Sequence, residues 1–198
     1  MYHSHTTEQP CKLVLLGNTN VGKSAILLRY VSHEFLPAPV PTVGASFTTK
    51  RLPQTDGSVI KLELWDTAGQ ERYRSLIPMY YKDATAAIVV FDVSSADSFH
   101  GAKEWVQEVK INSNPDTLIH LVANKIDLER AVPQEEASSF AQENDLALYE
   151  MSAKTGEGVV EAFAEIANQL YSVAQTPKSS LSLKTYKEQS SGGSKCCW

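Results

Sequence analysis

The residues from Gly17 to Ser24 have the spacing of a phosphate-binding loop, with two glycines separated by four residues and followed by lysine and serine. They lie between the apolar run 12–16 and the helical run 24–32, so the motif joins a predicted strand to a predicted helix. Backbone N–H groups at a helix N-terminus attract an anion, Lys23 adds a positive charge, and the Ser24 hydroxyl can coordinate Mg²⁺. The pattern predicts a polyphosphate site in preference to an ordinary glycine-containing turn. The loop residues expected to contact the ligand are Asn18, Thr19, Asn20, Val21, Gly22, Lys23, Ser24 and Ala25.

A second motif, Asn124-Lys125-Ile126-Asp127, indicates a guanine base in preference to adenine. It follows the apolar run 118–123, and ligands of open α/β sheets bind beyond the carboxyl ends of the strands. The Asp127 carboxylate can accept hydrogen bonds from both N1–H and the exocyclic amine of guanine, whereas adenine would leave it unpaired. Asn124 and Lys125 are expected to brace the loop and cover the ring. Three residues after the run 147–151 complete the predicted base pocket: Ser152, Ala153 and Lys154.

A third motif, Asp66-Thr67-Ala68-Gly69-Gln70-Glu71, ends the alternating run 59–65 and is suited to phosphate hydrolysis. Asp66 is expected to hold Mg²⁺ through a water molecule. Gly69 lets its backbone N–H approach the terminal phosphate closely, because it carries no Cβ. Gln70 can orient the attacking water.

Thr42, in the loop after the first predicted helix, is the remaining candidate ligand of Mg²⁺. A threonine in a loop is ordinarily a solvated hydroxyl, but here it accompanies the other parts of a phosphate site. Ser24, Thr42, phosphate oxygens and waters would together supply the oxygen ligands that Mg²⁺ prefers. Gln70 and Lys23 are the expected catalytic residues.

In this order and within one domain, the motifs resemble the Ras superfamily of small GTPases. Residues 65–73, followed by 80–84, are similar to the Rab branch. The segments 42–47, 87–92 and 102–106 resemble the early-endosomal subgroup of Rab proteins. The resemblance covers about residues 11–174 together with the terminal cysteines.

This resemblance implies a switch that binds GTP and GDP with Mg²⁺, hydrolyses GTP slowly, and recruits effectors that regulate vesicle traffic, with endocytosis and early-endosome fusion as the expected steps. Its implied partners are exchange factors, GTPase-activating proteins, GDP-dissociation inhibitor and Rab effectors. The implied location is the cytoplasmic face of the early endosome, with cycling through the cytosol, and a monomer is expected. Alternatives are another Rab step, a non-hydrolysing GTP-binding module, and a metabolic kinase or ATPase. The guanine motif disfavours the last of these.

Several aromatic residues have two interpretations. By position, Phe35 resembles the aromatic that lies edge-on to guanine, but it could instead anchor the helix end to the core. Phe47, Trp65 and Tyr80 resemble the exposed aromatic triad through which Rab effectors recognise the switch, with ordinary core packing as the alternative. The chain departs from Ras at Thr19, where Ras has glycine, and the proline-rich loop 35–42 lacks the aromatic that covers the phosphates in Ras.

The composition suits one domain with a tail. The 198 residues carry a formal net charge of −5, which disfavours nucleic acid as a main partner. No signal peptide or membrane-spanning run is evident, and Tyr2 excludes N-myristoylation. Cys11 is expected to be a small buried residue. We divide the chain into an N-terminal extension 1–10, a GTPase domain 11–174 and a disordered tail 175–198.

The tail is expected to attach the domain to a membrane. Residues 177–198 contain four lysines and one glutamate, a net charge of +3 that favours an anionic surface. The pair Cys196-Cys197 resembles the double-cysteine terminus of Rab proteins, which implies a geranylgeranyl group on each cysteine. The trailing Trp198 is an uncommon ending, and a solvated linker with unmodified thiols is the alternative.

Alternating apolar runs and helical periodicities predict an α/β fold. We expect a six-stranded, mostly parallel sheet with one antiparallel strand, and about five helices on both faces. Asp56-Gly57 is a strong hairpin signal. The predicted strands are 12–16, 46–52, 59–65, 86–91, 118–123 and 147–151, and the predicted helices are 24–32, a short one within 70–81, 95–111, 134–144 and 159–173.

Overall fold

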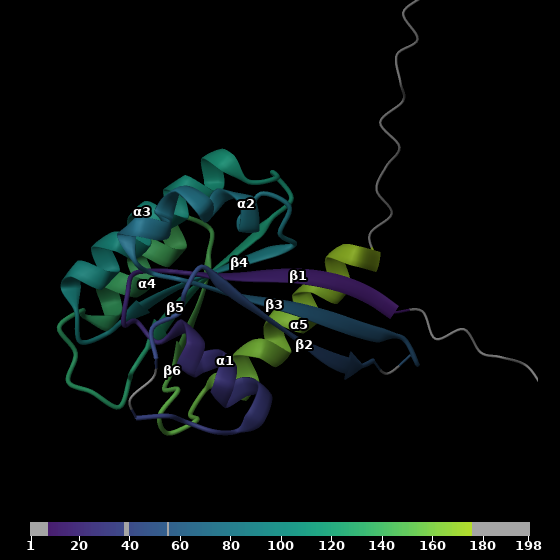
Figure 1. Ribbon diagram of the computed structural model, residues 1–198, viewed down its shortest axis with the longest axis horizontal. Coiled ribbons are helices and arrows are strands. Elements are labelled where there is room, and N and C mark those ends of the chain that lie inside the picture. The colour runs from purple at the N-terminus through teal and green to yellow at the C-terminus, as the bar shows by residue number, and fades with distance from the viewer. Residues whose placement is uncertain (1–7, 38–39, 55, 176–198) are drawn as a thin grey trace, which may run out of the picture.

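A six-stranded sheet with the order β2-β3-β1-β4-β5-β6 forms the centre of the molecule, shown in the computed structural model in Figure 1. The structure describes residues 8–37, 40–54 and 56–175. Neighbouring strands are parallel except for β2 and β3, which form an antiparallel hairpin. The predicted fold class is therefore confirmed. The strands are β1 (Glu8–Leu16), β2 (Ala45–Pro53), β3 (Val59–Thr67), β4 (Ala86–Asp92), β5 (Leu118–Asn124) and β6 (Ala147–Met151).

Helices cover both faces of the sheet, and the alternation of side chains along β1 shows why (Figure 1). Leu13 and Leu15 pack towards one face, while Val14 and Leu16 pack towards the other, so each face has its own apolar core. One core includes α1 (Lys23–Ser32) and α5 (Val159–Gln175). The other includes α2 (Pro78–Tyr81), α3 (Ala96–Asn112) and α4 (Gln134–Glu143), and a short 3₁₀ helix, η1 (Glu71–Leu76), precedes α2.

Three strands run further than the apolar pattern predicts. β3, β4 and β5 continue to Thr67, Asp92 and Asn124, so polar residues occupy their last positions. Backbone pairing extends to these polar strand ends. Asp66 pairs with Leu15 of β1, and Asp92 pairs with Asn124. A polar side chain can end a buried strand because its backbone groups remain paired while its side chain faces the sheet edge.

The hairpin and the first strand also follow backbone pairing. The hairpin predicted from Asp56-Gly57 is confirmed. Gly57 has φ 85° in the turn, and the Asp56 carboxylate accepts hydrogen bonds from the Ser58 N–H and hydroxyl. β1 begins at Glu8, four residues before its predicted start, because it pairs with β3 from Val59 onward. Cys11 is buried within this strand, as expected.

None of the helices in the described residues is long and apolar enough to span a bilayer. The segments 1–7 and 176–198, including Cys196 and Cys197, lie outside the described residues.

The side chain of His120 is buried in the sheet without a hydrogen-bond partner within the described residues. His120 of β5 is 2% exposed, and neither ring nitrogen is bonded. Its ring lies against Tyr149, with 5.8 Å between ring centroids. Burial lowers the pKa of His120 from 6.5 to about 4, because a charged imidazolium would lose its hydration there.

This histidine should make folding stability fall with acidification. The unfolded state takes up a proton near its ordinary pKa, whereas the folded state does not until about pH 4, so stability is lost as pH falls between these values. We expect the parent to lose roughly 2 kcal/mol more than His120→Leu between about pH 7 and pH 5 in urea unfolding. His100→Leu, at an exposed histidine, is the matched control and should track the parent. Equal pH dependence in the parent and His120→Leu would contradict the assignment.

Candidate functional site

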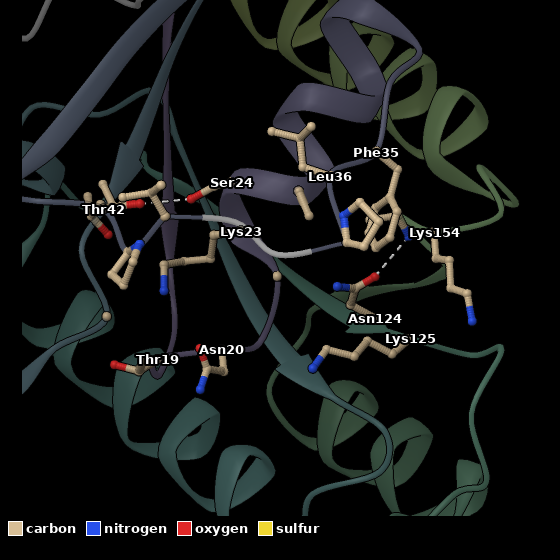
Figure 2. Close-up of a pocket in the computed structure, with 18 of the residues that line it drawn as sticks. Thr19, Asn20, Lys23, Ser24, Phe35, Leu36, Thr42, Asn124, Lys125 and Lys154 are labelled. Atoms are coloured by element: carbon tan, nitrogen blue, oxygen red, sulfur yellow. Dashed lines mark hydrogen bonds between the residues drawn. The ribbon is translucent and has the colours of Figure 1, made fainter.

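A cavity of about 520 Å³ lies at the carboxyl edge of the sheet and brings the three sequence motifs together. Figure 2 shows Ser24 and Thr42 towards one end of the cavity and Phe35, Asn124 and Lys154 towards the other. One end therefore suits phosphates and the other suits a base. Of the predicted site residues, the cavity is lined by Thr19, Asn20, Gly22, Lys23, Ser24, Ala25, Phe35, Thr42, Gly69, Gln70, Asn124, Lys125, Asp127, Ala153 and Lys154.

Four predicted site residues support the cavity from behind its lining. Asn18 contributes its backbone carbonyl to Lys23, and its side chain lies against Gly101 of α3. Val21 is buried and accepts a hydrogen bond from Asn124 through its carbonyl. Ser152 is fully buried, and Asp66 lies behind Ser24 and Thr42. These four residues do not line the cavity, but they contact the residues that do.

Lys23, at the first turn of α1, is buried in the loop that precedes it. Its Nζ donates to the carbonyls of Gly17 at 2.7 Å and Asn18 at 2.9 Å. Burial lowers the pKa of Lys23 to about 8, while the Asp66 carboxylate acts in the opposite direction. Even so, the ammonium is charged near neutral pH. An anion that entered the loop would meet a cation already held in place.

The candidate Mg²⁺ ligands converge although they come from three segments. The Ser24 and Thr42 hydroxyl oxygens are 2.8 Å apart, and they donate to Asp66 Oδ2 at 2.5 Å and 3.2 Å, respectively. The other carboxylate oxygen, Oδ1, is buried without a partner within the described residues. Burial raises the pKa of Asp66, against hydrogen bonds from Ser24 and Thr42 and the charge of Lys23. Hard oxygen donors with one buried unpaired carboxylate oxygen fit a small divalent cation such as Mg²⁺.

Gly69 packs directly against the phosphate loop. A Cβ at this position would lie 2.6 Å from the backbone of Asn18 and Thr19, so a larger residue would push the two segments apart. The absence of a side chain thus allows close packing of one backbone segment against the other. The expected approach of the Gly69 N–H to a terminal phosphate stays a prediction. The next residue, Gln70, is then placed on the cavity wall.

A buried amide joins the phosphate end to the base end. Asn124 Nδ2 donates to the Val21 carbonyl at 2.7 Å, and its Oδ1 accepts from the Ala153 N–H at 3.2 Å. Because Asn124 is 1% exposed, both bonds are shielded from water. The sequence predicted a bracing role, and the structure identifies the two loops that are braced.

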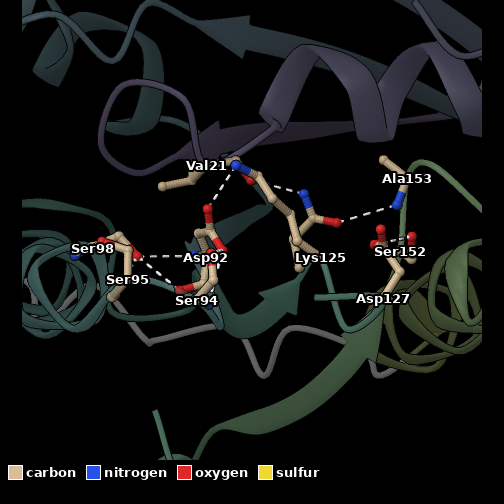
Figure 3. Close-up of polar contacts among 10 residues, drawn as sticks. Val21, Asp92, Ser94, Ser95, Ser98, Lys125, Asp127, Ser152 and Ala153 are labelled. Carbon is tan, nitrogen blue, oxygen red and sulfur yellow. Dashed lines mark hydrogen bonds and ion pairs between the residues drawn. The ribbon is translucent and has the colours of Figure 1, made fainter. Parts of the chain in front are cut away.

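Lys125 is held by an acidic residue that the sequence analysis missed. Its Nζ lies 2.6 Å from Asp92 Oδ2, while Asp92 Oδ1 accepts from the Ser94 N–H and hydroxyl (Figure 3). Although burial acts to raise it, the pKa of Asp92 is lowered, because hydrogen bonds from Lys125 and Ser94 outweigh burial. The available signal was that Asp92 directly follows an apolar run, as Asp66 does.

Asp127 presents an ionised carboxylate at the base end. Ser152 donates to its Oδ1 at 2.6 Å, and Lys154 Nζ lies 3.6 Å from its Oδ2. The pKa of Asp127 is lowered chiefly by the Ser152 hydrogen bond. The side chain lines the cavity and is charged at neutral pH, as a guanine-binding carboxylate must be.

The aromatic residues show features of both interpretations. Phe35 lines the cavity and also packs against the core between the sheet and α1 and α5. Phe47, Trp65 and Tyr80 form a continuous row, with ring centroids 4.9 Å and 5.6 Å apart. Phe47 is 51% exposed, whereas Trp65 and Tyr80 are half-buried and touch the other core. The row is thus both a packed cluster and an accessible surface.

The cavity also contains residues that no motif predicted. Most come from the loop after α1, whose apolar and proline side chains supply a wall that local sequence patterns do not identify. These additional lining residues are Leu36, Pro37, Val40, Pro41 and Leu128. Thr67 of the third motif also lines the cavity, although no role was predicted for it.

Comparison with known proteins agrees with this arrangement. Residues 12–172 match the Ras family. The chain is 47% identical over 191 residues to "Ras-related protein Rab5A" of Oryza sativa subsp. japonica, covering 94% of each chain. It is 50% identical to "Ras-related protein RABF2b" of Arabidopsis thaliana, over 83% of each chain. It is 47% identical to "GTP-binding protein ypt5" of Schizosaccharomyces pombe, over 80% of this chain and 77% of that protein.

Proposed function

Because this chain belongs to the Ras family, as a Rab GTPase of the early-endosomal subgroup, we propose that its cavity is the GTP and GDP site of a switch acting in endosomal traffic. The observation that supports this most is that the phosphate loop and the guanine motif line one cavity, although they lie about 100 residues apart. A nucleotide can span the two ends only if both motifs face the same space. The proposed nucleotide contacts are those predicted from the sequence.

We assign the phosphates to the end near Lys23 and the base to the end near Asp127. Backbone N–H groups of the loop 17–22 and the Lys23 ammonium balance the phosphate charge. Asp127 accepts from guanine, while Lys125, fixed by Asp92, covers the ring. Ser152 holds the Asp127 carboxylate in place.

Mg²⁺ would bind beside the phosphates, where it would neutralise charge that develops during hydrolysis. Ser24 and Thr42 would ligate it, and Asp66 would hold it through water. The hydroxyls of Ser24 and Thr42 donate their hydrogens to Asp66, and this leaves oxygen lone pairs that could ligate the ion.

Base selectivity tests the assignment of Asp127. In Asp127→Asn, an amide donor would face the guanine N–H groups, so GTP binding should weaken by about 100-fold or more, and xanthosine triphosphate binding should improve. Fluorescent-nucleotide competition measures both affinities. Asp145→Asn, at an exposed aspartate with φ 56° that asparagine tolerates, is the control. Unchanged GTP affinity in Asp127→Asn would remove this residue from the pocket.

Gln70 is proposed to orient the attacking water, because an amide has no useful basicity. No arginine lines the cavity in the described part of the chain, so a GTPase-activating protein is expected to supply one. The non-hydrolysing alternative would require Thr42 or Gln70 to be missing from the site, yet both line it.

Gln70→Leu should keep nucleotide affinity and lose hydrolysis. Unaided turnover of the parent is expected on the order of 10⁻⁴–10⁻³ s⁻¹, with roughly 10³–10⁵-fold stimulation by an activating protein. Single-turnover release of phosphate measures the difference. Gln142→Leu, on the exposed face of α4, should hydrolyse GTP like the parent. Hydrolysis at the parent rate in Gln70→Leu would refute the assignment.

Effector recognition is proposed for the surface that includes Phe47, Trp65 and Tyr80. This row lies on β2, β3 and α2, next to the segments that would contact the terminal phosphate. Exposed Val43 and Met79 extend its apolar character. Such a surface suits regulators and effectors that distinguish the two nucleotide states.

Membrane attachment is proposed for Cys196 and Cys197. One lipid chain gives only reversible binding, at about 0.8 kcal/mol for each buried CH₂, so a geranylgeranyl group on each thiol would give a durable anchor. An endosomal membrane is the proposed location, with release to the cytosol by GDP-dissociation inhibitor. Intact mass of the protein from its native cell should show both additions. A C-terminal peptide without prenyl mass would end this part of the proposal.

A further inference from the structure

One arginine of α1 donates hydrogen bonds to two separate loops. Arg29 Nε donates to the Ala153 carbonyl at 2.9 Å, and its Nη2 donates to the Lys154 carbonyl at 2.7 Å. Its Nη1 donates to the His33 carbonyl at 2.6 Å. In the described part of the chain, these bonds all go to backbone oxygens and none to a carboxylate. The guanidinium therefore binds the loop backbones, and it forms no ion pair within the described residues.

Both loops reach the base end of the cavity. His33 caps the C-terminal end of α1 in a left-handed conformation, φ 59°, and lies two residues before Phe35. Ala153 and Lys154 line the cavity themselves, and the Ala153 N–H is already bonded to Asn124. Arg29 thus joins the start of the loop 33–37 to the loop 152–154.

The geometry suits arginine specifically. A guanidinium is a planar fork whose N–H groups point in different directions, so one rigid group can serve carbonyls on two chain segments. A lysine ammonium is a single point charge and cannot span the same set in one fixed arrangement. The Arg29 stem also packs near Gly156, whose Cβ position would lie 3.5 Å from Arg29 Cδ.

We propose that Arg29 is a positioning residue that holds both walls of the base pocket and thereby slows GDP dissociation. This inference rests on the proposed function, since it concerns the same cavity. Release of the base requires the loops carrying Phe35 and Lys154 to separate or loosen. Bonds that tie both loops to one side chain oppose that motion without touching the phosphates. An exchange factor could accelerate release by breaking them.

The test compares Arg29→Met, which keeps the apolar stem, with Arg29→Lys, which keeps the charge. In stopped-flow assays with fluorescent GDP and Mg²⁺, we expect dissociation to be about tenfold faster in Arg29→Met, with little recovery in Arg29→Lys. Arg51→Met is the matched control, because Arg51 is exposed on β2 and pairs with Glu8. It should release GDP at the parent rate.

Two further measurements separate positioning from general destabilisation. Hydrogen exchange in the GDP-bound variants should increase at residues 153–156 and 33–36, while the strands keep their protection. Single-turnover hydrolysis of bound GTP should stay within about twofold of the parent, because the phosphate end is not changed.

Each outcome is decisive. Unchanged GDP dissociation in Arg29→Met, or exchange that increases throughout the sheet, would overturn the positioning role. Full recovery in Arg29→Lys would show that charge alone matters and would overturn the argument from the guanidinium fork. A parent protein that binds no GDP would overturn the proposed function itself, and this inference with it.

Discussion

The site depends on the buried side-chain amide of Asn124, which bonds the phosphate loop at Val21 and the base loop at Ala153. These partners are 103 and 29 residues away from it in sequence, and none of the three segments could form the cavity alone. Because the amide is shielded from water, leaving either partner unpaired would cost about 1–3 kcal/mol. One side chain, through two hydrogen bonds, thus sets the spacing between the end proposed for the phosphates and the end proposed for the base.

Other polar side chains also gather at this edge of the sheet. In an apolar core, these groups would be costly to bury without partners. The last two positions of β3, β4 and β5 include Asp66, Asp92 and Asn124, and each of these residues remains paired in the backbone ladder. Asp66 accepts a hydrogen bond from the Ser24 hydroxyl, and Asp92 forms an ion pair with Lys125. Asn124 joins two loops through its hydrogen bonds. A parallel sheet gives all these strand ends the same direction, so the polar groups gather without leaving buried backbone unpaired.

Loop segments border this edge of the sheet on the side of Ser24 and Thr42. Gly69 approaches the phosphate loop closely, and the loop after α1 lines the cavity with Leu36 and Thr42. Arg29 adds bonds at the base end that do not involve the phosphate end. This division fits a switch, because the base can stay bound while the segments near the terminal phosphate change their contacts.

The amino-acid sequence by itself determined the fold class, the motifs and most cavity residues. Local signals suffice there: glycine spacing around Lys23, apolar runs for buried parallel strands, and Asp56-Gly57 for the hairpin. Tertiary structure decided what depends on contacts between distant segments. The strand ends at Asp92 and Asn124, the ion pair of Asp92 with Lys125, and the bonds of Arg29 to Ala153 and Lys154 are of this kind. A hydrogen bond between strands, an ion pair, or a guanidinium bonded to two loops forms only where distant segments meet. The residue pattern within one segment does not identify the segment that it will contact.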